Sequence, residues 1–296
     1  MRTDKLNLAI KKVMGESSKK ILMKLLFPFR NNFILFNISN RAKEGRVNLD
    51  YWDESNNLGD TLSPVVVNYM LDLRDTKLNT TIDGKKHLYA IGSILTAGIQ
   101  DATVWGSGVL NAKLTYRLER RKLDIRAVRG PITRAILIDY GYSVPEIYGD
   151  PAIIMPEIYK AVPLKNRKKY GLITHKDYIL KEKYKEKEIA RLNICTDDYQ
   201  GFLDQLVSVD IVISSSLHGI ILAEAYGVPA ILLKPQIDMV KYYDYYYSTG
   251  RLNFPIADSI EQAMLIEPVE LPELDSIREK LKMSFPYDIF GEEQKK

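Results

Sequence analysis

The segment from Asp210 to Leu233 constrains the fold of this chain more than any other stretch. The β-branched run Asp210–Ile213 predicts a buried strand, and Ala230–Leu233 predicts a second one. Between them lie a polar turn and a helical stretch that ends at Gly227, a residue typical of a helix C-cap. Strand, helix and strand in this order form a βαβ unit, which requires a parallel sheet.

The turn of this unit carries three serines and a histidine, in the order Ser214-Ser215-Ser216-Leu217-His218-Gly219. Ligands of such folds bind at the carboxyl ends of the strands, and the N-terminus of the following helix offers backbone N–H groups to an anion. Two interpretations stay open on residue types alone. The turn is either an anion site or a set of helix-capping serines beside a structural histidine.

Strand and helix patterns alternate along the rest of the chain. Strands are expected at 47–52, 87–94, 102–108, 123–128, 170–174 and 192–195, and helices at 61–73, 131–138, 199–207 and 261–281. This alternation predicts an α/β protein with two Rossmann-like lobes, parallel sheets and a ligand cleft between them. We divide the chain into a segment 1–44, a first lobe 45–162, a second lobe 170–258 and a helical segment 259–296 that packs back on the first lobe. Residues 163–169 form the linker.

Composition excludes several classes of protein. A hydrophobic content of 46% and a charged content of 27% over 296 residues are typical of a soluble globular protein. The single cysteine, Cys195, excludes an internal disulfide framework and fits a reducing cytosol. The histidines, His87, His175 and His218, lack zinc-ligand spacing, so we expect no metal.

Charge is concentrated at the amino terminus. Residues 1–30 carry eight basic side chains and two acidic ones, a local +6 in a chain whose net charge is +4. The remainder is therefore close to neutral, and we expect no nucleic-acid surface on it. Apolar residues recur at helical spacing between the lysines, which fits either a basic amphipathic segment on an anionic membrane or an ordinary packed helix. The apolar stretch is too short for a membrane span and lacks a signal-peptide cleavage site.

Other predicted strands also end in turns that suit a ligand. Asn57, Gly59 and Asp60 follow the first strand, with Asp60 as the expected N-cap of the next helix. Gly106 and Ser107 follow the strand at 102–108. Turn geometry alone also explains both motifs.

Charged and aromatic groups add three further candidates. Arg129 follows the strand at 123–128, where it could contact a phosphate or carboxylate, or form a surface ion pair instead. His175 follows the strand at 170–174. The tyrosines of 244–251 suit either a sugar platform or a partly buried loop, and we expect the loop.

Five of these motifs, in this order and spacing, resemble the polysaccharide pyruvyl transferases over residues 45–255. They are Asn57-Leu58-Gly59-Asp60, Gly106-Ser107-Gly108, Arg129-Gly130-Pro131, Gly149-Asp150-Pro151-Ala152 and the serine turn through Gly219. The resemblance implies a fold similar to GT-B glycosyltransferases, with acceptor bound by the first lobe and donor by the second. It also implies transfer of the pyruvyl group of phosphoenolpyruvate onto two sugar hydroxyls, which forms a cyclic ketal and releases phosphate.

The resemblance assigns the donor to His218 and Arg129. Some members carry an arginine where this chain has Ser216, so another cation must help, and Lys234, Lys241 and Arg251 are the candidates. The substrate-binding residues that we expect are Asn57, Gly59, Asp60, Gly106, Ser107, His175, Ser214, Ser215, Ser216, Leu217, Gly219 and Glu224.

The chemistry of this reaction independently requires residues of these types, namely an acid/base and a cation. Its proton transfers need an acid/base that titrates near neutrality, the ordinary range of histidine, which suits His218. Arg129 would clamp an anion of the donor, while Asp60 or Glu224 would accept a proton from the sugar. No step requires a metal or a cofactor.

Two alternatives remain. Glu224 through Pro229 resembles the donor segment of GT-B glycosyltransferases that use nucleotide sugars, and a non-catalytic glycan- or anion-binding relative would share the fold. As partners we expect phosphoenolpyruvate and a lipid-linked glycan of capsule, exopolysaccharide or cell-wall synthesis. The basic segment 1–30 would then hold a cytoplasmic enzyme peripherally on the inner membrane face.

Overall fold

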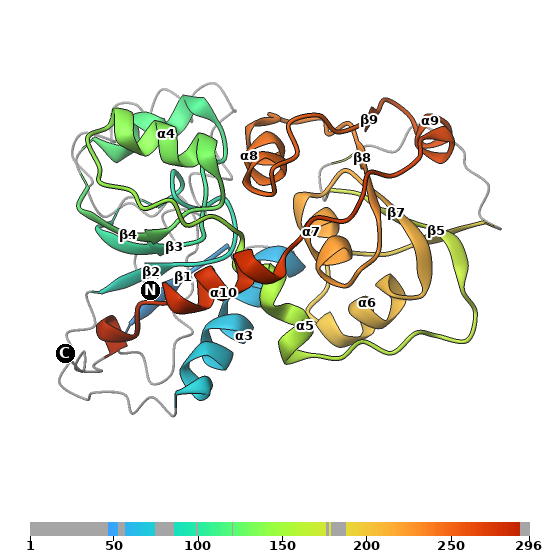
Figure 1. Cartoon of the computed structure of the whole chain (residues 1–296), viewed down its shortest axis with the longest axis horizontal. Helices are drawn as coiled ribbons and strands as arrows, with labels where there is room; N and C mark the ends of the chain where they lie inside the picture. Colours follow the sequence, from blue (N-terminus) through green and yellow to red (C-terminus); the bar gives the residue numbers. More distant parts are fainter. Residues whose placement is uncertain are drawn as a thin grey trace, which may run out of the picture. The chain divides into compact units, whose positions relative to one another are not determined.

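Two parallel sheets and the helices around them make up the part of the chain that the structure describes (Figure 1). The structure is a computed structural model, and it describes residues 47–52, 57–74, 86–98, 100–119, 121–175, 178 and 188–290. Two parallel sheets confirm the predicted α/β class. The predicted segment 1–44 lies outside the described residues.

The first sheet has four strands in the order β1-β2-β3-β4, and each neighbouring pair is parallel. The strands are β1 (Asn48–Asp50), β2 (His87–Tyr89), β3 (Ala102–Trp105) and β4 (Leu123–Ala127). Strands β2 and β3 are shorter than expected because the chain turns at Gly92 and Gly106, whose φ angles of 102° and 88° favour glycine. A parallel bridge between Val128 and Tyr148 extends the sheet beyond β4.

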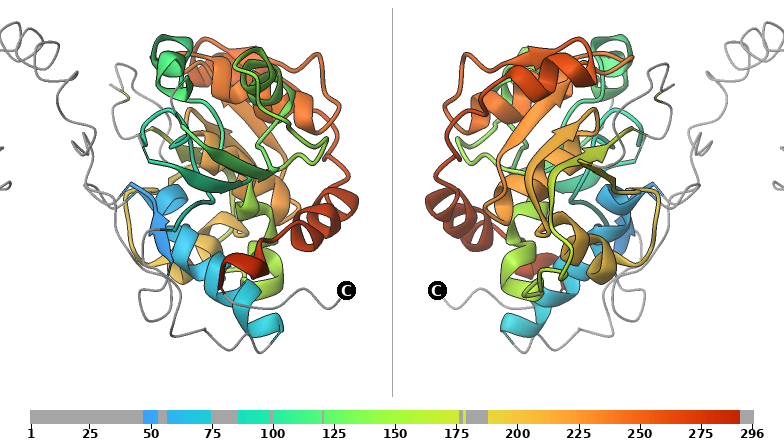
Figure 2. Two further views of the ribbon diagram at one scale, coloured as in Figure 1. Left: turned by 90° about the vertical axis from the view of Figure 1, so that its left-hand side faces the viewer. Right: turned by 90° about the vertical axis from the view of Figure 1, so that its right-hand side faces the viewer.

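The second sheet has five parallel strands in the order β6-β5-β7-β8-β9. They are β5 (Lys168–Ile173), β6 (Ile189–Arg191), β7 (Val209–Ser214), β8 (Ala230–Leu233) and β9 (Ile256–Ala257). Figure 2 shows how its strands twist relative to one another. Helix α7 (Leu217–Ala225) joins β7 to β8, which confirms the βαβ unit, and Gly227 follows it with a φ of 75°.

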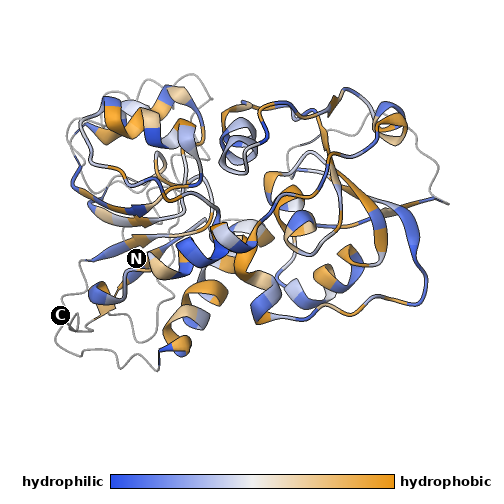
Figure 3. Cartoon of the chain, viewed as in Figure 1, coloured by the Kyte–Doolittle hydropathy of each residue, from blue (hydrophilic) through white to orange (hydrophobic). Residues whose placement is uncertain are grey.

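Helices flank both sheets. Helix α3 (Leu58–Leu73) follows β1, α4 (Pro131–Asp139) follows β4, and α6 (Tyr199–Leu206) precedes β7. The short 3₁₀-helices are η3 (Ala112–Leu118), η4 (Pro151–Ile154) and η5 (Tyr287–Phe290), and α5 (Met155–Ile158) follows η4 directly. Buried residues of α3, η4 and α7 belong to one hydrophobic cluster. The strands β7 and β8 that pack beside it are largely hydrophobic (Figure 3).

Several predicted boundaries were wrong. The strand expected at 192–195 lies instead at Ile189–Arg191, because Asn193 Oδ1 accepts a hydrogen bond from the backbone N–H of Cys195 and turns the chain away from the ladder. Strand β5 begins at Lys168, within the expected linker. One helix was expected at 261–281, but Pro268 and Pro272 separate α9 (Ile260–Leu265) from α10 (Asp275–Met283).

The tyrosine-rich stretch is not a loop. It forms most of α8 (Val240–Ser248), in which Tyr242, Tyr245 and Tyr246 are buried. Burial of three aromatic side chains on one helix outweighs the modest helix propensity of tyrosine.

The C-terminal residues contact elements of the first sheet. Trp105 Nε1 of β3 donates to the carbonyl oxygen of Leu281 in α10 at 2.9 Å. Tyr287 in η5 donates through its hydroxyl to the carbonyl oxygen of Met70 in α3 at 2.8 Å. Among the described residues, no helix combines the length and the apolar character that crossing a membrane requires.

Candidate active site

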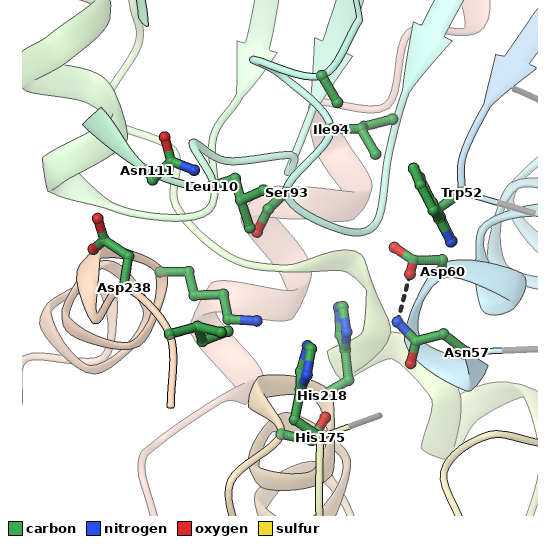
Figure 4. Close-up of a pocket in the computed structure, with 14 residues that line it drawn as sticks. Trp52, Asn57, Asp60, Ser93, Ile94, Leu110, Asn111, His175, His218 and Asp238 are labelled. Atoms are coloured by element: carbon green, nitrogen blue, oxygen red, sulfur yellow. Dashed lines mark hydrogen bonds between the residues drawn. The ribbon is translucent and has the colours of Figure 1, made fainter. Parts of the chain in front are cut away.

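A pocket of about 350 Å³ lies at the carboxyl ends of strands from both sheets (Figure 4). Trp52 follows β1, Ser93 follows β2, and His175 follows β5. The first turns of α3 and α7 contribute Asp60 and His218. The remaining lining residues are Asn57, Ile94, Ala97, Leu110, Asn111, Ser216, Ile237, Asp238 and Lys241.

His218 is placed by the burial of its helix. Nearly every residue of α7 is buried, so the helix is enclosed on all sides and its position is fixed by packing. The imidazole of His218 lies against the α-carbon of Gly59 in α3, and a β-carbon at position 59 would overlap Nδ1. The absence of a side chain at Gly59 therefore leaves room for the imidazole.

Asp150 contacts the other nitrogen of His218. Its Oδ2 lies 3.4 Å from Nε2, and its Oδ1 accepts a hydrogen bond from the backbone N–H of Ala152 at 3.1 Å, as the N-cap of η4. The Asp150 side chain is fully buried, and neither Oδ2 nor Nε2 has a hydrogen bond within the described residues. Asp150 Oδ2 therefore lies next to Nε2, where a carboxylate can accept a hydrogen bond from a protonated ring nitrogen.

Asp150 was not among the predicted site residues, although it lies in one of the five motifs that resemble the family. The signal was available, because Asp150 follows a glycine at the end of a strand-like segment. Gly149 has a φ of 135°, and its backbone N–H bonds to the carbonyl oxygen of Val128.

Asp60 lies beside His218 in the pocket. Its Oδ2 accepts a hydrogen bond of 2.5 Å from Asn57 Nδ2 (Figure 4). Burial raises the pKa of Asp60 above its ordinary value, while the charge of His218, the Asn57 hydrogen bond and the charge of Lys241 oppose that rise. Such a carboxyl can hold a proton nearer to neutral pH than an exposed one.

The expected N-cap role of Asp60 was wrong. Helix α3 begins at Leu58, so its N-cap is Asn57, whose backbone is extended, and Asp60 lies within the first turn. The side chain of Asp60 is thereby directed to the pocket instead of to the helix N–H groups.

Two of the three serines hold the turn by hydrogen bonds to backbone groups, and the third lines the pocket. Ser214 Oγ accepts from the Ser216 backbone N–H at 3.0 Å and donates to the Ser216 carbonyl oxygen at 2.9 Å. Ser215 Oγ accepts from the backbone N–H of His175 at 2.9 Å, which joins two strand-end loops. Of the three, Ser216 lines the pocket.

Four other expected residues form the frame of the turns. Leu217 is buried in the hydrophobic cluster, and a β-carbon at Gly219 would overlap Ser214 Oγ. Ser107 is fully buried and donates to the carbonyl oxygen of Gly92 at 2.8 Å, while Gly106 packs against Pro151. These residues hold strand-end loops together outside the pocket lining.

Arg129 lies behind the pocket wall. Its side chain is fully buried, and Nε donates to Asp244 Oδ2 at 3.0 Å. Nη2 donates to the carbonyl oxygen of Val109 at 2.7 Å, and Nη1 donates to Ser93 Oγ at 2.5 Å. Ser93 is thus the lining residue through which Arg129 reaches the pocket.

The three candidate cations have different surroundings. Lys234 is exposed and pairs with Asp258 at 2.8 Å. Arg251 donates to both carboxylate oxygens of Glu224, at 2.6 and 2.8 Å. Lys241 lines the pocket.

Glu224 is occupied by its neighbours. Besides the two hydrogen bonds from Arg251, its Oε2 accepts one of 2.6 Å from the Tyr245 hydroxyl. Its side chain is 2% exposed. Glu224 therefore belongs to a buried network and not to the pocket lining.

Several lining residues had no signal in the sequence. Asn111 and Asp238 come from loops or helix ends, and the pattern of apolar residues does not identify such positions. Trp52 ends the strand predicted at 47–52, but its residue type gave no reason to expect it in the pocket. Within the described parts of the chain, no group of His, Cys, Asp and Glu side chains has the arrangement of a metal site.

Comparison with known proteins identifies the family. The family model for polysaccharide pyruvyl transferase matches residues 55–236, which is more than half of the chain. An uncharacterized protein of Acanthamoeba polyphaga mimivirus is 29% identical over 215 residues, which cover 67% of this chain and 72% of that protein.

Proposed function

The chain belongs to the polysaccharide pyruvyl transferase family, and from that premise we propose that it transfers the pyruvyl group of phosphoenolpyruvate onto two hydroxyls of one sugar. The family implies a transferase that acts on polysaccharide. The observation that carries the proposal is the meeting of His218, Asp60 and Lys241 around one pocket. We also propose that the two sheets belong to two Rossmann-like lobes arranged as in GT-B enzymes, with the pocket in the cleft between them.

The first step joins the sugar to the donor. A sugar hydroxyl attacks C2 of phosphoenolpyruvate, C3 takes up a proton to become a methyl group, and the hydroxyl loses its proton. His218 delivers the proton to C3, and Asp60 receives the proton of the hydroxyl. A histidine and a carboxyl whose pKa is raised by burial suit these two transfers.

The second step closes the ketal. The bond between C2 and the phosphate oxygen breaks, and phosphate leaves with the bonding electron pair. The second hydroxyl then attacks C2 and gives its proton to the phosphate or to a pocket base. One phosphoenolpyruvate and one diol thus yield one cyclic ketal and one phosphate.

Supporting residues prepare the site for this chemistry. Asp150 orients the imidazole through its contact with Nε2 at 3.4 Å and stabilises it when it is protonated. The N-terminus of α7 and the Ser216 side chain offer hydrogen-bond donors to an anion. These features support an anionic donor beside an acid/base.

The nucleotide-sugar alternative is less well supported. It would use Glu224 to contact the donor, yet both oxygens of that carboxylate accept hydrogen bonds from Arg251. Breaking this buried pair to bind a nucleotide would leave Arg251 without its partner, which is costly.

The experiment that tests the function is incubation of the full chain with phosphoenolpyruvate and a panel of glycans, free and lipid-linked. We expect one acceptor to gain the mass of one pyruvyl ketal, with release of one phosphate. The variant His218→Ala should give neither product. Release of a nucleotide from a nucleotide sugar, or binding of glycans without turnover of phosphoenolpyruvate, would overturn the proposal.

The acceptor that we propose is a lipid-linked glycan at the cytoplasmic membrane face. The +6 charge of residues 1–30 supports peripheral binding to anionic lipids. We expect the full chain to bind anionic vesicles less strongly as salt rises, and deletion of residues 1–30 to abolish that binding. Unchanged vesicle binding after the deletion would contradict the proposal that residues 1–30 bind the membrane.

A further inference from the structure

We propose that Lys241 binds an anionic group of the donor, and that Arg129 acts on donor binding from a distance, by holding helix α8 in place through Asp244. The inference rests on the proposed function, since it concerns the donor of that reaction. It assigns contact to Lys241 and positioning to Arg129, which is not the division that the resemblance implies.

Lys241 has the placement of a ligand-binding cation. It lies in the first turn of α8 and lines the pocket with His218 and Ser216. It is 7% exposed, so its aliphatic stem is packed while its charge influences the pocket. The charge of Lys241 acts on Asp60, because it opposes the rise in the pKa of Asp60 that burial causes.

The charge balance of the pocket requires such a cation. Asp60 and Asp238 line it, and Asp150 lies directly behind His218. Phosphoenolpyruvate brings a phosphate and a carboxylate into these acidic surroundings. Of the described lining residues, Lys241 is the one lysine or arginine.

Helix α8 is held by a buried clasp one turn beyond Lys241. Asp244 Oδ2 accepts from Arg129 Nε at 3.0 Å and from Thr133 Oγ1 at 2.6 Å, and Oδ1 accepts from the Thr133 backbone N–H at 2.9 Å. The side chains of Arg129 and Asp244 are both fully buried. The clasp therefore ties α8 to the start of α4.

Two further contacts show that α8 is closely held. A β-carbon at Gly130 would overlap the carbonyl oxygen of Asp244, so the two backbones approach too closely for a side chain there. On the other side, the Tyr242 hydroxyl donates to the carbonyl oxygen of Ser215 at 2.6 Å. Lys241 is thereby positioned relative to both the serine turn and the loop that carries Arg129.

The first test measures donor binding by Lys241 variants. Loss of a charge-assisted contact in Lys241→Met should raise KM for phosphoenolpyruvate roughly 10- to 100-fold and leave KM for the acceptor nearly unchanged. Lys241→Arg should restore part of the loss. The control is Lys234→Met, which removes an exposed lysine from the same sheet region. A KM for phosphoenolpyruvate in Lys241→Met that equals that of the unmodified chain would overturn the assignment.

The second test separates contact from positioning by combining variants. If Arg129 acts through α8, then Arg129→Met and Asp244→Asn each raise KM for phosphoenolpyruvate, and neither raises it further in the Lys241→Met background. If Arg129 touches the donor itself, its effect multiplies with that of Lys241→Met. Asp244→Asn keeps the shape of the clasp, so it provides the answer if Arg129→Met does not fold.

The third test identifies the anionic group and separates this inference from the proposed function. Inorganic phosphate and pyruvate serve as probes of the phosphate and carboxylate positions, by calorimetry with the full chain. Lys241→Met should weaken the binding of one probe and spare the other. Weakening of neither would contradict the inference, whereas failure of the unmodified chain to bind phosphoenolpyruvate at all would contradict the proposed function.

Discussion

The α-carbon of Gly59 packs directly against the imidazole of His218, so that the first turns of α3 and α7 meet without an intervening side chain. This contact brings a helix that follows β1 of the first sheet and a helix that follows β7 of the second sheet to one pocket. It also fixes the ring plane of the residue that we propose as acid/base.

Gly59→Ala should inactivate the enzyme without unfolding it. A methyl group at position 59 would overlap the imidazole and displace it. Because catalysis depends on the position of the acid/base, we expect turnover to fall roughly 100-fold. The matched control is Ser63→Ala, one turn later in α3, where the buried hydroxyl makes no hydrogen bond within the described residues. Turnover of both variants, measured as phosphate release, checks the prediction. Equal activity of the two would contradict it.

Asp60→Asn should lower activity and raise stability above acidic pH. Burial raises the folded-state pKa of Asp60 above 3.8, so the folded chain binds this proton more tightly than the unfolded chain. The unmodified protein therefore loses stability as pH rises from about 3.8 through the raised pKa. The uncharged amide avoids this loss.

Thermal unfolding across pH checks this prediction. The stability gain of Asp60→Asn should grow with pH from about 3.8 through the raised pKa, and it should disappear below 3.8, where the carboxyl becomes protonated in the unfolded state as well. A gain that is independent of pH would show that relief of the buried charge is not its source.

Asp150→Asn should lower kcat by about 100-fold with little effect on KM for phosphoenolpyruvate, because it weakens the orientation and charge stabilisation of His218 without touching the donor. It should also change the pH profile of kcat, which a merely structural residue would not do. Asp139→Asn, at an exposed position in α4, is the control. A rise in KM without a fall in kcat would instead place Asp150 in donor binding.

Glu224→Ala should destabilise the fold by about 3–5 kcal/mol, since it leaves the largely buried Arg251 without its partner. Denaturant unfolding gives the free energy of unfolding. The double variant Glu224→Leu with Arg251→Met should be far less destabilised, because it removes both charges. If Glu224→Ala instead kept full stability and lost donor binding alone, Glu224 would be a donor ligand after all.

The sequence by itself determined the class of fold, and it predicted the turn at the centre of the site that we propose. Runs of apolar residues such as Ala230–Leu233 must be buried, so they indicate strands inside the protein. These patterns predicted the parallel sheets correctly. The turn Ser214–Gly219 was identified because a strand, a polar turn and a helix follow one another within a short stretch. Local interactions decide such features, so they can be read from a single chain segment.

Boundaries were predicted less well where side chains compete with the backbone pattern. Asn193 ends β6 by a local hydrogen bond, and the tyrosines of α8 form a helix because other parts of the chain cover them. Neither effect is visible in the periodicity of apolar residues.

Only the tertiary structure decided which polar groups meet. Asp150 and His218 are 68 positions apart in the sequence, yet their side chains lie 3.4 Å apart. Arg129 and Lys241 both looked suitable for an anion, but Arg129 is buried against Asp244 whereas Lys241 lines the pocket. Sequence specifies the charge of a side chain, and the packing of distant elements determines whether that charge faces a ligand or a buried partner.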